Sequence, residues 1–335
     1  MRVMRRILGI AGVLLTMACV AAVVARLAPS DVSAMPYLPI AVSVMPWFVV
    51  VSALATVLTL AGRRWLSALV ALLCLVVQVW WQLPFYRDGD SLPADATRAI
   101  ATAHPNPIDG YARVMTLNVY KGAADPEAIV DTVSRERVEV LALQETTDDF
   151  VGRLESAGIG RYLPYSTVSS SDGVYGNGLW SVTSLQDPVE DEVGSSASFM
   201  PGATVAFDDG ATPVRFVSVH TTSPVPGYWR QWKRSLDELG MMRSHDGYRY
   251  VFMGDFNATY DHAPFRDFLG SRFRDAARLS ARGLTFTWPA NRSGVPRFAA
   301  IDHIVVDQGM RAGRVSVVPI AGSDHAALLA TIAVS

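Results

Sequence analysis

Hydrophobic and polar positions divide the chain into an apolar N-terminal part and a longer part in which short apolar runs alternate with polar segments. Near the N-terminus, three nearly uncharged segments have about the length, roughly 20 apolar residues, with which a helix crosses a bilayer. They run from Ile7 to Ala25, from Leu38 to Ala61 and from Trp65 to Leu83. The pattern therefore predicts three transmembrane helices in a membrane region at residues 1–86.

The arginines of this region indicate its orientation. Arg2, Arg5 and Arg6 precede the first segment and Arg63 and Arg64 follow the second, whereas "APSDVSAMPY" between the first two has none. Positively charged ends stay in the cytoplasm, so three spans would place everything after residue 86 outside. The first segment could also be a secretory signal, with "DVSA" as a passable cleavage site. Both alternatives predict an integral cell membrane protein with an extracytoplasmic C-terminal part.

The rest of the chain has the pattern of one α/β domain. Residues 87–110 are rich in Pro, Asp, Ala and Thr without apolar periodicity, which is typical of a linker. Residues 111–335 have the length of one domain. Their apolar runs resemble strands that are covered on both faces, and the runs are "RVMTLNV" from Arg113, "VEVLALQ" from Val138, "VRFVSVH" from Val214, "YRYVFMG" from Tyr248, "IDHIVVD" from Ile301 and "ALLATIAV" from Ala327.

Two helices are expected between these runs. In "DPEAIVDTVSRER", Asp125 is placed to cap a helix and Pro126 to lie in its first turn. The second candidate, "YWRQWKRSLDELGMMR", follows a Pro/Gly break. The alternation of strands and helices predicts an α/β fold in which the strands pack as a two-sheet sandwich flanked by helices.

Composition and charge narrow the function of this domain. The only cysteines, Cys19 and Cys74, lie in the predicted spans, so disulfides and zinc–thiolate sites are excluded from residues 111–335. Eight arginines and four aspartates precede residue 99, which leaves 21 basic and 27 acidic residues, a balance of −6. Proteins that grip long polyanions usually present a basic face, and this balance does not favour one.

Polar side chains collect where the predicted strands end. Strand ends of a layered α/β domain converge on one rim, and Asp255 and Asn257, two residues apart, face the same side. Carboxylates and amides without thiolates suit Mg²⁺ or Mn²⁺, and nearby histidines can act on a phosphate and its leaving oxygen. The candidates are Asn118, Glu145, His220, Asp255, Asn257, Asp302, Asp324 and His325.

The order of these motifs resembles that of the endonuclease/exonuclease/phosphatase superfamily. "LNV", "LQE", "VSVH", "GDFNA", "IDHI" and "SDH" follow one another at plausible spacings over nearly all of the chain after the linker. The superfamily includes pancreatic deoxyribonuclease, abasic-site endonucleases, neutral sphingomyelinases and inositol-phosphate 5-phosphatases. The resemblance implies a four-layer, deoxyribonuclease-like sandwich and metal-dependent hydrolysis of phosphate esters.

The resemblance also implies a set of metal ligands. Glu145 would be the main metal-binding carboxylate, with Asn118 beside it and Asp324 completing the shell through water. Some nucleases of the superfamily carry an aspartate where this chain has Tyr120. The departure favours a single metal ion.

By the same resemblance, the remaining candidates would act on the phosphate and the attacking water. Asp255 would orient or deprotonate the water, and Asn257 would hold the water or the phosphate. His325 would contact the phosphate oxygens, with Asp302 on its far nitrogen to fix tautomer and charge. His220 would lie near the leaving group.

Other polar and aromatic residues are expected to have structural roles. His303 alternates with Asp302 along a strand and should face the opposite side as a packed or rim histidine, and His245 and His262 are expected at the surface. Trp229 and Trp232 could contact nucleic acid or lipid headgroups, or they could only pack an amphipathic helix. In "GNGLWSV", Asn177 and Ser181 match the family pattern only loosely.

Three functions remain open. The first is a phosphodiesterase or phosphatase at the outer membrane surface, acting on a lipid-linked or extracellular substrate, because the spans hold the site near lipids. The second is a membrane-tethered extracellular nuclease. The third is a domain without catalysis that binds phosphorylated ligands.

Overall fold

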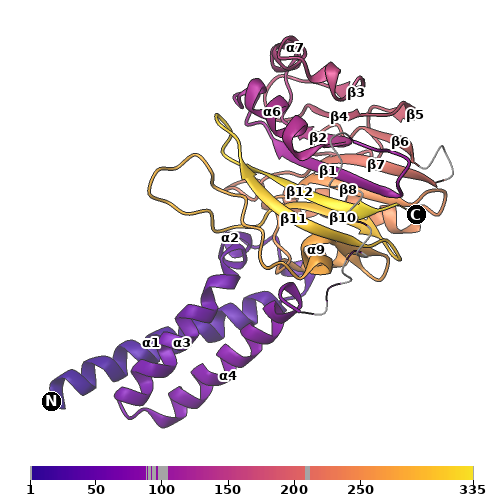
Figure 1. The fold of residues 1–335 in the computed structure, drawn as a ribbon. Coiled ribbons are helices and arrows are strands. Elements are labelled where there is room, and N and C mark those ends of the chain that lie inside the picture. Colours follow the sequence, from indigo (N-terminus) through magenta and orange to yellow (C-terminus); the bar gives the residue numbers. More distant parts are fainter. Residues whose placement is uncertain are drawn as a thin grey trace.

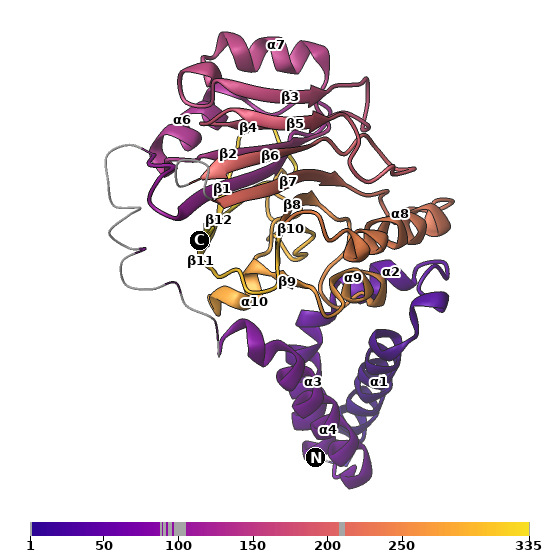
Figure 2. The ribbon, with the colours of Figure 1, turned by 90° about the vertical axis from the view of Figure 1, so that its right-hand side faces the viewer.

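The protein consists of a β-sandwich and a bundle of N-terminal helices that extends from one end of it (Figure 1). The structure is a computed structural model that describes residues 2–87, 89, 92, 96, 105–207 and 212–334. A second view shows the bundle meeting the sandwich near α2 (Leu38–Ser43), α8 (Trp229–Met241) and α9 (Ala263–Leu269) (Figure 2).

The N-terminal bundle contains two long apolar stretches rather than three. Among the described residues, Arg2–Leu27 and Trp65–Phe85 are long and apolar enough to cross a membrane. The expected transmembrane helix from Leu38 to Ala61, the second of the three, is wrong, because Pro46 lacks an amide hydrogen and interrupts a continuous helix. The region comprises α1 (Arg2–Leu27), α2, α3 (Phe48–Ala61) and α4 (Trp65–Gln82), with 3₁₀ turns at Ser30–Val32, Met45–Trp47 and Leu83–Phe85.

Small residues let α1 and α3 approach closely. A Cβ atom on Gly12 would lie 2.7 Å from the Thr59 backbone nitrogen, and one on Gly62 would lie 2.3 Å from the Gly9 Cα. Close backbone contact through glycine is typical of helix pairs in membranes. It also brings Arg64, whose Cγ would lie 3.2 Å from a Cβ on Gly9, to the basic start of α1.

In the part of the chain that the structure describes, two six-stranded sheets form the sandwich. The first has the order β11-β12-β1-β2-β4-β3 and the second β5-β6-β7-β8-β10-β9. In each sheet one central pair is parallel, β1 with β2 and β7 with β8, and the remaining pairs are antiparallel. The strands are β1 (Tyr111–Asn118), β2 (Val140–Gln144), β3 (Tyr165–Ser169), β4 (Asn177–Ser181), β5 (Leu185–Val189), β6 (Gly202–Phe207), β7 (Thr212–His220), β8 (Tyr250–Asp255), β9 (Phe273–Asp275), β10 (Asp302–Asp307), β11 (Ala312–Pro319) and β12 (Ala326–Ala333).

Among the described residues, three large hydrophobic clusters hold the layers together. One lies between the sheets, with Val114, Phe216 and Ile304 among its members. Another joins the first sheet to α6 (Pro126–Glu136) and α7 (Asp148–Ser156), and the third joins the second sheet to α8 and α9. A short helix, α10 (Ala276–Ser280), follows β9. The expected four-layer sandwich flanked by helices is confirmed.

All six predicted strands are present as β1, β2, β7, β8, β10 and β12, and both predicted helices as α6 and α8. The side chain of Asp125 caps α6 by accepting a hydrogen bond from the Glu127 amide at 3.0 Å. The proposed linker at residues 87–110 lies mostly outside the described residues. Among its described members, Ala96 is buried beside Tyr111 and Ala333.

Candidate active site

The structure brings all eight predicted residues to one rim of the sandwich. Asn118 ends β1, Glu145 follows β2, and His220 and Asp255 end the parallel strands β7 and β8. Asp302 begins the antiparallel strand β10, and the strand register places it opposite Asp255. Asp255 is thus flanked by His220 and Asp302 in the second sheet.

A hydrogen-bonded amide joins the two sheets at this rim. Nδ2 of Asn118 donates to Oε1 of Glu145 and to Oδ2 of Asp255, each at 3.1 Å. Oδ1 of Asn118 accepts from the Tyr120 amide at 2.9 Å, and Oε2 of Glu145 accepts from the Lys121 amide at 2.8 Å. These contacts hold the Glu145 carboxylate, next to the first sheet, close to the Asp255 carboxylate of the second sheet.

Two of the candidate residues have a strained backbone conformation. Glu145 and Asn257 both have positive φ, at 60° and 46°, in the left-handed region that costs a non-glycine residue roughly 1 kcal/mol or more. Strain of this kind concentrates at functional sites. Gly254 is required for a different reason, because a Cβ there would lie 1.9 Å from the Val219 carbonyl oxygen.

His325 lies between two buried carboxylates. Its Nδ1 lies 2.8 Å from Oδ2 of Asp302, and its Nε2 lies 3.6 Å from Oδ2 of Asp255. Burial alone would lower the pKa of His325, but the charges of Asp302 and Asp255 more than offset it and raise the pKa to about 10. The ring is therefore an imidazolium at neutral pH, and its Nδ1–H donates to Asp302.

Asp255 is the carboxylate at the centre of the site. Burial raises its pKa to about 6, and Asp302 acts in the same direction, while His325 and His220 oppose the shift. Its Oδ1 accepts from the Asn257 amide at 2.8 Å. The raised pKa makes this carboxylate more basic than an ordinary aspartate, which suits a residue that accepts a proton near neutral pH.

Asn257 supports Asp255 in this arrangement. Its Nδ2 donates to the Thr221 carbonyl at 2.9 Å and to Oδ2 of Asp255 at 3.3 Å. Both amide hydrogens are therefore used within the protein. The geometry favours an orienting role for Asn257 over direct binding of phosphate.

His220 faces the same carboxylates from the other side. Its Nε2 lies 3.8 Å from Oε1 of Glu145 and 3.7 Å from Oδ2 of Asp255. Its Nδ1 lies 3.0 Å from the Val174 carbonyl oxygen, so Nδ1–H donates there and Nε2 is directed at the site.

The acidic residues of the rim fit a divalent cation. Burial raises the pKa of Asp324, and the charge of Glu145 acts in the same direction while His325 opposes it. Oδ1 of Asp324 is buried and has no hydrogen-bond partner among the described residues. A cation beside Glu145 and Asp324 would relieve this repulsion, and oxygen donors suit Mg²⁺ or Mn²⁺.

A second group of possible ligands overlaps the site. Ligand atoms of Asp255, Asp302 and His325 lie within 4.8 Å of one another. A ligating histidine must be neutral, however, whereas the charges of Asp302 and Asp255 raise the pKa of His325 and favour its protonated form. The raised pKa of His325 therefore favours a cation on the side of Asn118, Glu145 and Asp324.

Two residues of the site were missed from the sequence. The Ser323 hydroxyl donates to the Asn118 carbonyl at 2.6 Å and accepts from the His325 amide at 2.9 Å, so it ties the loop of Asp324 and His325 to β1. The order Ser-Asp-His is typical of a serine turn and offered a signal. Trp288 Nε1 donates to Oδ2 of Asp324 at 3.4 Å, and no sequence pattern indicated that contact.

Of the three histidines expected to have structural roles, His303 and His245 lie where the sequence predicted, and His262 does not. His303 is packed, as expected: Nδ1 lies 2.5 Å from Oδ2 of Asp275, and Nε2 lies 2.9 Å from the Ala258 carbonyl oxygen. His245 is exposed, as expected. His262, expected at the surface, is only 2% exposed, because its ring bonds to a backbone carbonyl of α2, a contact between distant parts of the chain that the sequence does not reveal.

The tryptophans of α8 and the two loosely matched residues, Asn177 and Ser181, have structural roles. Trp232 is fully buried and Trp229 is 8% exposed, so both pack α8, as in the second of the two expected roles. Nδ2 of Asn177 donates to the Phe199 carbonyl and to Ser198, whose hydroxyl donates to the His220 carbonyl at 2.7 Å. Ser181 accepts from the Thr183 amide at 3.2 Å.

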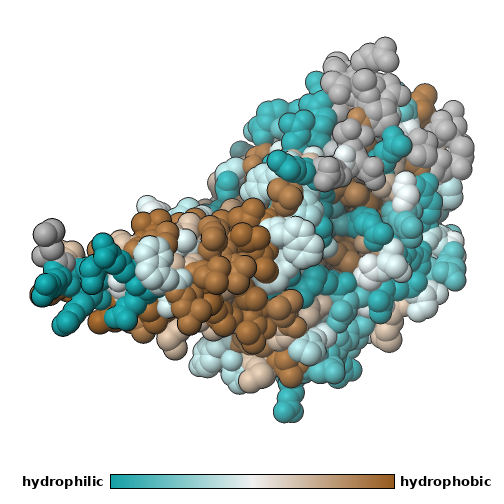
Figure 3. Space-filling model, turned by 90° about the horizontal axis from the view of Figure 1, so that it is seen from below, coloured by the Kyte–Doolittle hydropathy of each residue, from teal (hydrophilic) through white to brown (hydrophobic). Residues whose placement is uncertain are grey.

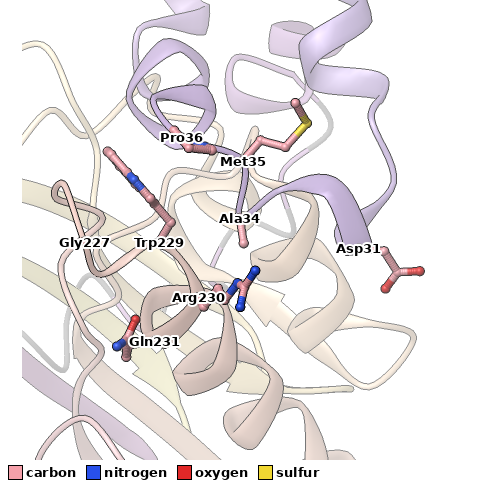
Figure 4. Close-up of a pocket in the computed structure, with 8 residues that line it drawn as sticks. All are labelled: Asp31, Ala34, Met35, Pro36, Gly227, Trp229, Arg230 and Gln231. Carbon is pink, nitrogen blue, oxygen red and sulfur yellow. The ribbon is translucent and has the colours of Figure 1, made fainter.

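A cavity of about 590 Å³ lies away from this chemistry. Figure 4 shows its walls, the loop before α2 on one side and the first turn of α8 on the other. None of the eight rim residues lines it; the lining residues are Asp31, Ala34, Met35, Pro36, Gly227, Trp229, Arg230 and Gln231.

Solved structures share this fold. D. rerio TDP2 in complex with a single-strand DNA product has a TM-score of 0.56 and 16% identity, covering 67% of this chain and 99% of its own. The mannosyl-6-phosphatase Bt3783 of Bacteroides thetaiotaomicron has a TM-score of 0.51 and 14% identity, covering 66% and 99%. The 3' phosphatase NExo of Neisseria, bound to a product DNA hairpin, has a TM-score of 0.52 and 19% identity, covering 65% and 98%.

Sequence comparison identifies the family. No curated protein matches the chain. The model of the "Endonuclease/Exonuclease/phosphatase family" matches residues 115–325, more than half of the chain, and this range holds all eight rim residues. The chain therefore belongs to the endonuclease/exonuclease/phosphatase family of metal-dependent phosphoester hydrolases.

Proposed function

We propose that the chain hydrolyses phosphate esters at a membrane surface with Mg²⁺ or Mn²⁺. The observation that carries the proposal is the convergence of four carboxylates and two histidines on one rim, from five separate parts of the chain. A bound cation would supply Lewis-acid stabilisation of charge on the phosphate. The proposed ligands are Asn118, Glu145 and Asp324.

The protein's own groups divide the remaining work. Asp255 orients the attacking water and accepts its proton, and Asn257 holds Asp255. The imidazolium of His325 stabilises negative charge on the phosphate oxygens, and Asp302 holds that ring in place. His220 lies near the leaving oxygen.

Membrane attachment through α1 and α4 explains their surface. Only 28% and 22% of their apolar windows are buried, unlike core helices of a globular protein. Figure 3 shows a hydrophobic surface over the bundle. Leu14, Leu69 and Val76 are among the exposed apolar side chains of these two helices. We propose that residues 1–86 form the membrane region, 87–110 the linker and 111–335 the catalytic domain.

The basic residues favour an extracytoplasmic catalytic domain. The turn at Arg63 and Arg64 lies beside the start of α1, which carries Arg2, Arg5 and Arg6. This basic end lies opposite the sandwich (Figure 1), and basic ends stay in the cytoplasm.

The seating of the sandwich favours a substrate at the level of lipid headgroups. Trp47, before α3, donates to the Phe298 carbonyl at 3.0 Å, and the Phe298 ring contacts Trp288, which bonds to Asp324. The site is therefore only a few side chains from the outer end of the helices. We propose a lipid-linked phosphate ester as the first substrate class.

A nuclease is the second candidate, because similar structures hold DNA products. A comparison of substrates separates the two. The full chain in nanodiscs is assayed with Mn²⁺ on phospholipid, on single-stranded DNA and on bis(p-nitrophenyl) phosphate, beside His325→Ala and, as a control, Asp275→Asn.

We expect hydrolysis of the lipid in preference to DNA, lost in His325→Ala and kept in Asp275→Asn. Faster cleavage of DNA, with rates that fall steeply as salt rises, would support the nuclease instead. No metal-dependent hydrolysis of any ester would contradict the proposed activity.

A further inference from the structure

The segment from Ala258 to His262 connects the candidate active site to the N-terminal helices. It directly follows Asp255 and Asn257, and it folds back on itself as a turn. The His262 amide donates to the Thr259 carbonyl at 3.0 Å, and the Thr259 amide donates to Nδ1 of His262 at 2.8 Å.

His262 carries this turn onto α2. Because Nδ1 accepts from an amide, the ring proton is on Nε2, which donates to the Pro39 carbonyl at 2.8 Å. Burial lowers the pKa of His262 to about 4, so the ring stays neutral and keeps both bonds. Its edge packs against Trp232, with ring centroids 5.2 Å apart.

An ion pair holds the same turn to the end of α1. Nε of Arg26 lies 2.5 Å from Oδ1 of Asp261, and both side chains are largely buried, at 8% and 12% exposure. The guanidinium lies over the Trp81 ring of α4, 3.9 Å from its centroid. Arg266 of α9 donates to the Arg26 carbonyl at 3.1 Å. The turn thus contacts α1 and α2 directly and α4 through Arg26.

The contacts reach Asp255 over a short path. Trp232, which packs on His262, donates from Nε1 to the Asn257 carbonyl at 2.9 Å. Asn257 is in the left-handed conformation and its amide holds Oδ1 of Asp255. A strained residue keeps its conformation only when its surroundings hold it, and here some of those surroundings rest on the N-terminal helices.

From these contacts we infer that the N-terminal helices position Asp255, through Arg26 and His262 acting on the turn at residues 258–262. The inference rests on the proposed function and adds that the membrane region takes part in hydrolysis as well as in anchoring. Arg26 and His262 are positioning residues, since neither contacts the reacting groups. A misplaced proton acceptor slows the chemical step more than it weakens substrate binding.

The test measures kcat and KM separately. The full chain in nanodiscs hydrolyses bis(p-nitrophenyl) phosphate with Mn²⁺, and the variants are Arg26→Ala, Arg26→Lys and His262→Phe. Arg230→Ala is the matched control, because Arg230 lines the cavity at the same junction and does not belong to the turn. Thermal unfolding of each variant is measured alongside.

We expect Arg26→Ala and His262→Phe to lower kcat about tenfold with KM within about twofold. Arg26→Lys, which keeps the charge, should recover part of the loss, and Arg230→Ala should keep the wild-type kcat. Unchanged kcat in both test variants would overturn the inference. The same holds if kcat and thermal stability fall in parallel in every variant, the control included.

Hydrogen exchange separates this inference from the proposed function. If the wild-type chain hydrolyses no ester, the proposed function fails, and exchange of the peptide carrying the Asn257 and Thr259 amides decides the positioning role. Exchange about tenfold faster in Arg26→Ala than in Arg230→Ala would support it. Equal exchange in the two variants would overturn it.

Discussion

Two buried Asp–His pairs lie on opposite faces of β10. In both pairs an aspartate contacts Nδ1 of the histidine, but the two histidines differ in what they can do with the second ring nitrogen. Asp302 and His303 are neighbours along the strand, so their side chains point to opposite faces. On one face Asp302 binds Nδ1 of His325 at 2.8 Å, and on the other His303 binds Asp275 at 2.5 Å. The carboxylates raise the pKa of both histidines against the effect of burial.

The difference lies in the second ring nitrogen. Nε2 of His303 donates to the Ala258 carbonyl, which completes its hydrogen bonding. Nε2 of His325 instead faces Asp255 at 3.6 Å and Asp324 at 4.0 Å. In the proposed mechanism, only the Asp302–His325 pair has a far ring nitrogen left to contact a substrate.

The largest expected difference in kcat is between the variants that remove one or the other of the two histidines. His325→Ala should lower kcat on the order of a thousandfold, since it removes the positively charged imidazole ring that is proposed to face the phosphate. His303→Ala should lower kcat less than tenfold, because His303 is joined to the segment beside the site by one hydrogen bond, to the Ala258 carbonyl. It should lower the thermal stability more than His325→Ala does. Steady-state kinetics and thermal unfolding of both variants measure the contrast, and equal losses of kcat would break it.

The carboxylates give the second contrast. Asp302→Asn should lower kcat about a hundredfold, because the ring of His325 loses its charge partner and its fixed tautomer. Asp275→Asn should keep kcat and lose stability. A pH–rate profile checks the cause, since the charge on His325 should be lost at lower pH in Asp302→Asn. A profile identical to that of the wild type would contradict the role of Asp302.

The sequence indicated the Asp302–His325 pair and a packed His303, but it did not indicate that Asp275 is the partner of His303. Central strands such as β1 and β12 were predictable because both faces are buried and apolar, and their polar ends mark the rim. The edge strands β3 and β5 were not, because most of their side chains are exposed or half-buried. The buried position of His262 depends on its hydrogen bond to the Pro39 carbonyl, 223 residues away in the chain, and no local sequence pattern can indicate such a contact.

Metal binding should separate the site from the His303 pair. Glu145→Gln should raise the Mn²⁺ concentration for half-maximal activity by about 10- to 100-fold, since a neutral amide is a poorer ligand. EDTA should abolish activity, and Mn²⁺ should restore it. Asp275→Asn should leave the Mn²⁺ requirement unchanged, and a shift there equal to that of Glu145→Gln would argue against the assigned metal side.

The smallest effect is the pH dependence of stability. The folded-state pKa of His303 is raised above its ordinary value of 6.5, so the pair stabilises the fold fully below pH 6.5 and less as pH rises through the folded-state pKa. One proton contributes a slope of at most about 1.4 kcal/mol per pH unit. His303→Phe should flatten the decline in unfolding free energy above pH 6.5, and an unchanged slope would show that the pair does not contribute.

The location of a bound metal tests the central claim most directly. Crystals of the full chain grown with Mn²⁺ would reveal the ion by its anomalous scattering. We expect one ion about 2 Å from an oxygen of Glu145, on the side of Asn118 and Asp324, with His325 still hydrogen-bonded to Asp302. An ion bound to the ring of His325, or one away from this rim, would contradict it.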